Sequence, residues 1–190
     1  MMKKQFALII LTTLLSFHVC MAQDMYITRN GQITFFSTTP VEDIRAVNNE
    51  ASSVINTKTG AMQFVVLIKS FQFKKTAMQE HFNRKDYMDS DNFPKSEFKG
   101  TIIDLSKVDF KKDGNYPVTV EGNLTMHGVT NKLKTSGVIS VKEGRISSSS
   151  KFKIKLADYK ISVPAIVASK VADAVEVTVT CSYDPYQPKS

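Results

Sequence analysis

The sequence predicts an all-β protein in which about eight antiparallel strands form one domain. Apolar and polar residues alternate with a period of two over stretches of about 10 residues, which is typical of strands with one wet face. Gly60, Gly114 and Gly144 separate these stretches as turns. The 190 residues, 42% of them hydrophobic and 23% charged, suit one domain with a core and exclude collagen, low-complexity disorder and a polytopic membrane protein.

The N-terminal segment predicts export. Lys3 and Lys4 precede an apolar run over residues 6–15, and Ala22 offers a small residue for cleavage. The run is shorter than the roughly 20 residues that a membrane-spanning helix needs. We therefore expect a bacterial signal peptide over residues 1–22, cleavage near Ala22, and a mature domain over residues 23–190 that is periplasmic or secreted.

The leader also admits two other interpretations. The apolar run would also suit a buried N-terminal helix, and Cys20 would also suit a lipid attachment site. Lipidation is disfavoured because Val19 occupies a position where a lipoprotein signal has a small residue. Loss of Cys20 with the leader leaves Cys181 without an intramolecular partner, and its alternating context predicts a buried, inert thiol.

The predicted strands share one apolar face and one polar face. They are expected over residues 33–37, 52–58, 62–70, 97–102, 117–127, 133–141, 146–156 and 171–182. Such strands must stack as two sheets or close on themselves, and closure removes the exposed edges. A closed sheet of eight strands has room for one small ligand.

Two short helices are expected to interrupt the strands. Thr39, Pro40 and Glu42 form a capping box, and Thr76 to Gln79 repeat the pattern. The second helix is expected to extend to about Lys85, followed by a loop over residues 86–94.

Strand parity predicts which side chains share the interior, because a slip of one residue would turn a whole set to the solvent. We expect these to line a ligand tunnel: Phe64, Val66, Ile68, Phe98, Ile102, Val120, Leu124, Met126, Phe152, Ile154 and Val177. Small residues on the same face, such as Gly122 and Ser150, are expected to leave room between the bulky ones, with bulges or loose packing as the alternative.

Residues 120–130, which read VEGNLTMHGVT, resemble the G-x-L-T-x-H-G-V-T segment of the YceI-like family. The order His81, Phe82, Tyr87, Asp89, Phe93, Pro94 and Phe98 is similar to that family's H-L, F-F-D and Y-P-x-I-x-F segments. Residues 157–159 and 175–179 resemble its closing strands, so the match covers about residues 26–184. Gln32 to Phe35 keep the alternation of the family's first strand but lack its usual Ser and His.

The resemblance implies an extended, lipocalin-like β-barrel whose apolar tunnel holds a polyisoprenoid or quinone-like lipid. We therefore expect a non-enzymatic carrier, storage protein or sensor, with an isoprenoid-type lipid as its ligand and no cofactor. The alternative is a structural or interaction module whose barrel is filled by its own side chains.

The sequence carries no catalytic or metal-binding motif. It lacks G-x-S-x-G, a P-loop, a dinucleotide glycine pattern and H-E-x-x-H. His127 is expected to stabilise a turn or line the tunnel mouth. His81 is expected to form a hydrogen bond or to face the solvent. Asp86, Asp89 and Asp91 are assigned to turn chemistry rather than calcium, because Phe93 and Pro94 interrupt the EF-hand pattern. We expect no metal site.

The charged and exposed residues predict the partners. The formal net charge of +7 without interleaved aromatic and basic residues predicts no nucleic-acid binding. Lysines near strand ends would suit an anionic head group: Lys74, Lys75, Lys132 and Lys134. Val65 and Leu67, on the outer face, predict either a homodimer or cover by the helix over residues 76–85. Transient membrane contact is expected if the ligand is a lipid.

Overall fold

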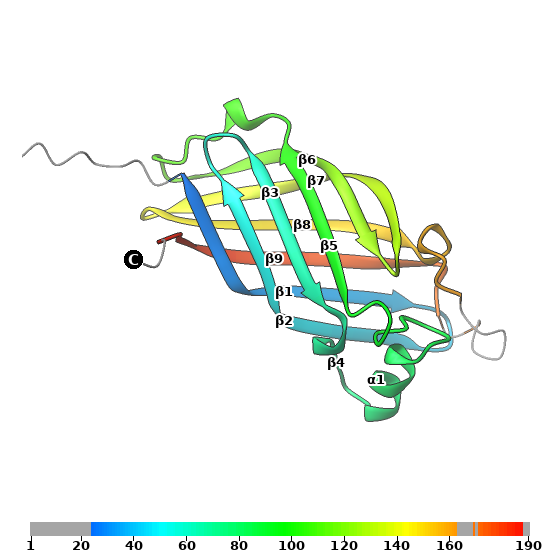
Figure 1. Ribbon diagram of the computed structural model, residues 1–190. Helices are drawn as coiled ribbons and strands as arrows, with labels where there is room; N and C mark the ends of the chain where they lie inside the picture. Colours follow the sequence, from blue (N-terminus) through cyan, green and yellow to red (C-terminus); the bar gives the residue numbers. More distant parts are fainter. Residues whose placement is uncertain (1–23, 163–168, 170, 188–190) are drawn as a thin grey trace, which may run out of the picture.

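The computed structural model describes residues 24–162, 169 and 171–187, and they form a closed antiparallel barrel (Figure 1). Its strands are β1 (Met25–Thr38), β2 (Asp43–Asn56), β3 (Ala61–Leu67), β5 (Lys95–Ile102), β6 (Gly114–Met126), β7 (Val129–Lys142), β8 (Arg145–Lys155) and β9 (Ala174–Pro185). They are ordered β1-β9-β8-β7-β6-β5-β3-β2, and β2 pairs with β1 to close the sheet. This confirms the predicted eight-stranded antiparallel barrel. The predicted leader over residues 1–22 lies outside the described residues.

The alternation in the sequence sets which face each strand buries. In β8, Ile146 and Ile154 are buried whereas Lys151, Lys153 and Lys155 are exposed. The outward charges pair across strands, as Lys151 Nζ does with Glu176 Oε1 at 2.8 Å. Along the described chain, no helix has the length and apolar character needed to cross a bilayer.

The first two strands are longer than predicted. β1 and β2 each contain 14 residues, although only residues 33–37 and 52–58 showed a clear pattern. The register of β1 against β2 shifts on both sides of Gly31, and the polar residues Asn48 and Asn49 interrupt the alternation on β2. These irregularities hide both strands from a period-two search.

The first predicted helix is wrong and the second is confirmed. Residues 39–42 form the turn between β1 and β2, in which Thr39 Oγ1 accepts hydrogen bonds from the backbone N–H groups of Val41 and Glu42. The Thr39 hydroxyl therefore stabilises the turn between β1 and β2 and not the start of a helix, because no helical pattern of apolar residues follows it. The second segment forms α1 (Thr76–Asn83), which ends two residues before Lys85. Its N-cap residue is Lys75 and no side chain caps it, so the predicted capping box at Thr76 is wrong.

Four shorter elements have described bounds. A two-residue strand, β4 (Gln72–Phe73), pairs with β2. Single 3₁₀ turns lie at Ile68–Ser70, Leu105–Lys107 and Leu156–Tyr159. The first of these cuts short the strand expected over residues 62–70.

Two apolar clusters divide the interior. The closed-end cluster consists of eight buried residues: Ile55, Met62, Ile102, Val118, Ile139, Ile146, Cys181 and Tyr183. The second cluster lies at the α1 end, where Phe35, Phe73 and Phe82 pack against buried residues such as Phe71 and Ile154. Figure 1 shows α1 and β4 beside that end of the barrel.

Val65 and Leu67 remain exposed, at 38% and 49% of their surface. The prediction that the helix covers them is therefore wrong, since α1 packs on β4 and on the aromatic residues of the α1 end. Homodimerisation through this pair stays a prediction.

The His127–Gly128 turn joins β6 to β7 in a two-residue hairpin. Both residues have positive φ, 50° and 73°, as a tight turn with right-handed strand twist requires. A Cβ on Gly128 would lie 2.6 Å from the Phe93 ring. The glycine in this motif is therefore required by conformation and by packing.

Gly128→Ala is expected to lower the free energy of unfolding by about 2–3 kcal/mol, because it combines a strained φ with a clash. Gly144→Ala is the matched control, since Gly144 has the same φ of 73° but nothing within 4 Å of its Cβ position. That variant should lose only about 1 kcal/mol in urea unfolding. Equal losses would show that Phe93 does not constrain the turn.

Candidate functional site

The barrel encloses an apolar cavity of about 590 Å³ that lies between the two clusters. Ten of the eleven predicted tunnel residues lie on its wall: Phe64, Val66, Ile68, Phe98, Val120, Leu124, Met126, Phe152, Ile154 and Val177. Ile102 does not line the cavity; it is buried in the closed-end cluster, of which other members reach the wall. The volume falls within the range of small-molecule sites.

Several inward-facing side chains on this wall are only partly buried. Phe64, Leu124, Met126 and Phe152 share the inner face with fully buried neighbours but keep accessible surface. A packed core would cover them on all sides. Their free surface therefore faces the cavity.

The aromatic residues of the α1 end form part of the wall that parity did not predict. Phe35, Phe71, Phe73 and Phe82 contact one another with ring centroids 5.0–5.6 Å apart. The Ile68–Ser70 turn breaks the strand before Phe71, so the inner face cannot be followed by counting residues. The change of apolar phase near Phe71 and Phe73 is the one sequence signal of this break.

The wall reaches the protein surface beside α1. The exposed residues Lys75 and Ala77 line the cavity there, together with Glu42 from the turn between β1 and β2. The opposite end is sealed by buried residues of the closed-end cluster. The α1 end is therefore the mouth.

Gly100 and Gly122, on the inner face of the barrel, do not provide the space. Gly100 and Gly122 face each other across β5 and β6, and a Cβ on Gly122 would lie 2.4 Å from the Lys99 carbonyl oxygen. The same Cβ would lie 2.7 Å from Phe98 Cζ. These glycines allow the Phe98 ring to lie over the strands, so the expectation that they leave room for a ligand is wrong.

The inner wall also carries hydroxyl groups, and most have partners in the protein. Thr135 Oγ1 and Ser150 Oγ are 3.2 Å apart, and Ser148 Oγ lies 3.3 Å from the Tyr183 hydroxyl. Tyr183 also bonds to Ser53, at 3.0 Å. Ser96 Oγ is different: it is buried and has no hydrogen-bond partner.

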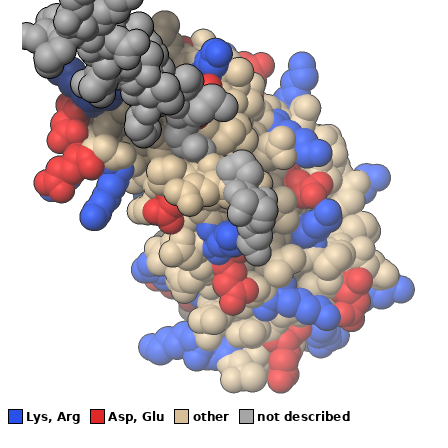
Figure 2. Space-filling model, turned by 60° about the vertical axis from the view of Figure 1, so that its left-hand side comes forward, with Lys and Arg blue, Asp and Glu red and all other residues tan. Residues whose placement is uncertain are grey.

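The charges at the mouth are balanced rather than cationic. Lys75, the one lysine on the described cavity wall, forms an ion pair with Glu42 at 2.9 Å. Lys132 and Lys134 lie on the outer face of β7 and do not line the cavity. Figure 2 shows basic and acidic groups interspersed on the visible face, without a continuous basic patch.

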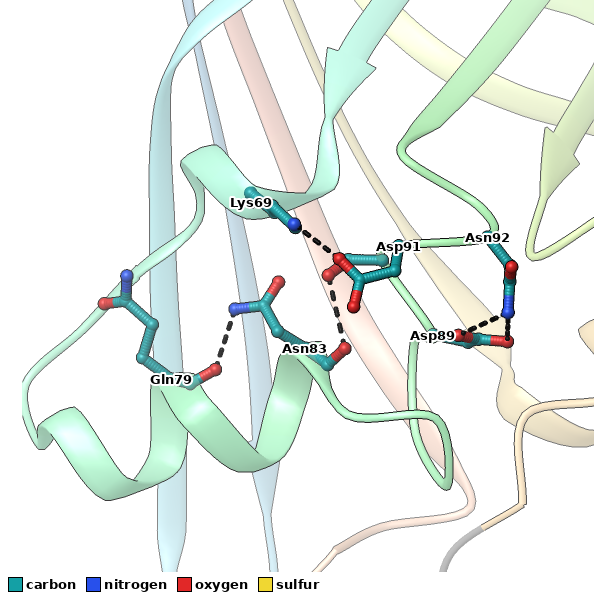
Figure 3. Close-up of polar contacts among 7 residues, drawn as sticks. Lys69, Gln79, Asn83, Asp89, Asp91 and Asn92 are labelled. Atoms are coloured by element: carbon teal, nitrogen blue, oxygen red, sulfur yellow. Dashed lines mark hydrogen bonds and ion pairs between the residues drawn. The ribbon is translucent and has the colours of Figure 1, made fainter.

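The loop after α1 is held by local polar contacts (Figure 3). Asn83 Nδ2 donates to the Gln79 carbonyl at 2.8 Å, and Ser90 Oγ donates to the Asn83 carbonyl at 3.2 Å. Lys69 Nζ bonds Asp91 at 2.6 Å across the loop, and Asn92 donates to the Asp89 carboxylate. These contacts hold α1 and its loop beside the mouth.

The three aspartates of this segment point to separate partners. Asp86 pairs with Arg84 at 3.1 Å. Asp89 accepts a hydrogen bond from Asn92, and Asp91 pairs with Lys69. Among the residues that the structure describes, no three His, Cys, Asp or Glu side chains gather to hold a metal ion.

The histidines have structural contacts. His127 Nδ1 donates to the Tyr159 carbonyl at 3.1 Å, and its ring lies 4.6 Å from that of Phe93. His81 lines the mouth and stacks on Tyr87 at 6.4 Å. His127 therefore fixes the turn after β6 against the neighbouring loops.

Cys181 lies in the closed-end cluster with 1% of its surface exposed. Burial raises the pKa of its thiol from 9.0 to about 11, more than the opposing hydrogen bonds with Tyr183 and Ser148 lower it. Burial also raises the pKa of Tyr183. Both groups are neutral at physiological pH, which suits the apolar floor of the cavity.

The native Cys181 thiol should react with a disulfide reagent at pH 8 at least about a hundredfold more slowly than in urea-unfolded protein. A pKa of about 11 instead of 9.0 lowers its thiolate fraction by that factor, and burial adds to the effect. Native reactivity should rise with pH up to about 11. Equal rates in the two states at pH 8 would contradict the assignment.

The fold and cavity define the protein as a closed antiparallel barrel with a ligand-sized apolar interior. The family model of the YceI-like domain matches residues 16–183, so the chain belongs to the YceI-like family. No curated protein sequence matches the chain significantly.

Solved structures share the fold. The chain is similar to a polyisoprenoid binding domain from Saccharophagus degradans, implicated in plant cell wall breakdown, with a TM-score of 0.72 and 16% identity over 86% of this chain and 99% of that one. It is also similar to Burkholderia cenocepacia BcnA, with a TM-score of 0.68 and 15% identity over 81% of this chain and 96% of that one. The Campylobacter jejuni YCEI protein gives a TM-score of 0.60 and 17% identity over 78% and 90%.

Proposed function

We propose that this protein is an exported, non-enzymatic binding protein that holds a polyisoprenoid or quinone-like lipid in its barrel. The observation that carries the proposal is the apolar cavity of about 590 Å³, open at α1 and sealed at the other end. A relative of the same fold is described as polyisoprenoid-binding, which supports the ligand class. The lipid would be carried, stored or sensed.

The binding mechanism is burial of hydrocarbon. Each methylene removed from water contributes about 0.8 kcal/mol, so a long chain binds tightly to an apolar wall with few polar contacts. The wall residues from β3, β5, β6 and β8 surround the cavity and supply this surface.

The alternative is a structural module without a ligand. A barrel filled by its own side chains would not leave this volume or the partly accessible Phe64 and Phe152. An enzyme is less favoured still, because His81 stacks on Tyr87 and His127 bonds to the Tyr159 carbonyl.

Export and lipid exchange complete the proposal. The leader pattern of residues 1–22 supports cleavage and a periplasmic or secreted protein. Loading an insoluble lipid requires transient contact with a membrane or another carrier, and we assign that contact to the mouth beside α1.

Protein purified from its native compartment should release one isoprenoid-type lipid per barrel on solvent extraction, as measured by mass spectrometry. The delipidated protein should take up an added prenylated quinone or polyprenol to the same ratio. If neither extraction nor uptake yields lipid, the structural module becomes the better account.

Leu133→Trp should lower uptake of such a lipid at least about tenfold while the free energy of unfolding changes by less than about 1 kcal/mol, because the added rings enter open space. Leu133 lies on the cavity wall opposite Gly122. Lys132→Trp, on the outer face of the same strand, is the control and should bind normally. Strong destabilisation by Leu133→Trp alone would indicate a filled core.

The mature protein isolated from the cell envelope or medium should begin at Gln23. N-terminal sequencing or intact mass measurement checks this cleavage. A lipid-modified Cys20, or a retained leader, would contradict the proposed processing.

A further inference from the structure

Ser96 is a polar side chain in an apolar part of the cavity wall. It is the second residue of β5, lies opposite Val66 of β3 and shares the inner face with Phe98. Only 8% of its surface is exposed, and its hydroxyl has no hydrogen-bond partner. A buried, unpaired hydroxyl costs free energy, so its presence requires a reason.

The other inward-facing serine and threonine hydroxyls on the described wall are satisfied within the protein. Ser37 Oγ accepts from the Ala172 N–H at 2.9 Å. Thr135 and Ser150 bond to each other, and Ser148 bonds to Tyr183. Ser96 alone of this set is left to interact with whatever occupies the cavity.

Ser96 lies near the mouth end of the cavity wall. β5 begins at Lys95, and the preceding Pro94 carbonyl accepts from Ile68 N–H at 2.9 Å, which fixes the strand beside the mouth. From Ser96 the wall continues inward through Phe98 and Val120 to the closed end. A lipid with its head at Ser96 can extend its chain along this path.

The charges near the mouth limit the kind of head group. Lys75 is already neutralised by Glu42, and the described wall carries no second lysine or arginine. Among the described residues of the wall, a diphosphate buried here would meet no free lysine or arginine, which is costly for a dianionic group. A neutral oxygen needs only one hydrogen bond.

We propose that the Ser96 hydroxyl anchors the head of the bound lipid and selects a neutral oxygen, such as a quinone carbonyl or a prenol hydroxyl, over a diphosphate. This inference rests on the proposed lipid-binding function. Ser96 donates to the carbonyl of a quinone or exchanges a hydrogen bond with a prenol, and the isoprenoid chain fills the cavity.

The test uses delipidated full-length mature protein and four probes: a prenylated quinone, a polyprenol, the hydrocarbon squalene and a polyprenyl diphosphate. Ser96→Ala should weaken the quinone and polyprenol about fivefold, the worth of one hydrogen bond, and change squalene less than twofold. Ser96→Thr keeps the hydroxyl and should retain the preference for oxygen-bearing lipids. Wild-type protein should bind the polyprenol more tightly than the diphosphate.

A stability readout separates anchoring from a structural role. Ser96→Ala removes an unpaired buried hydroxyl, so it should raise the Tm of the lipid-free protein by about 2–4 °C. Ser90→Ala is the matched control, because Ser90 is also buried but its hydroxyl donates to Asn83, and Ser90 does not line the cavity. That variant should lower the Tm and leave the ratio of polyprenol to squalene affinity unchanged.

Three results would overturn the anchor: equal effects of Ser96→Ala on squalene and polyprenol, no effect on either, or tighter binding of the diphosphate. In these cases the lipids still bind and the proposed function stands. If none of the four probes binds wild-type protein, the proposed function itself fails, and the anchor with it.

Discussion

Closure of the sheet by the pairing of β1 with β2 is the constraint on which the rest of the structure depends. β1 pairs with β9 on one side and with β2 on the other, so every second side chain of eight strands points into one enclosed volume. The register shifts around Gly31 accompany this double pairing. A closed sheet has no free edge, and its interior must be filled either by side chains or by a ligand.

The two ends of the barrel differ in how their interior is filled. At the closed end, Ile55, Ile139 and Ile146 are almost fully buried, and the Tyr183 hydroxyl is satisfied by Ser53 and Ser148. At the α1 end the wall includes aromatic side chains from β1, from β4, from α1 and from Phe71 after the Ile68–Ser70 turn. The closed end thus supplies stability, while the α1 end can give access without unfolding the barrel.

The alternation of residues in the later strands predicted the barrel and ten residues of the cavity wall. Parity placed Ile102 on the correct face but not at the correct depth, because depth depends on how the closed end packs around it. The Thr39 hairpin turn was mistaken for a helix since both use the same hydroxyl cap. Phe71 was missed because a 3₁₀ turn interrupts the period-two pattern just before it. Phe35 lies in a regularly paired part of β1 that keeps the alternation, yet it was not included among the predicted wall residues.

Contacts between residues on different strands were harder to predict from the sequence. The glycines of β5 and β6 looked like free space, yet their role emerges only when Phe98 and the Lys99 carbonyl lie over them. Likewise, the missing partner of Ser96 is visible only once Val66 is placed opposite it. Pairing between distant segments determines both features.

The central claim is that lipid occupies the space inside the barrel. The chain contains no tryptophan, so a single introduced one reports its own surroundings. Phe152→Trp places this reporter on the cavity wall, and Lys153→Trp places it on the outer face of the same strand. A prenylated quinone quenches indole fluorescence on contact. Titration with this lipid should quench the fluorescence of Phe152→Trp saturably, at one quinone per barrel, and leave that of Lys153→Trp nearly unchanged. Equal quenching of the two variants, or no quenching of Phe152→Trp, would contradict the account.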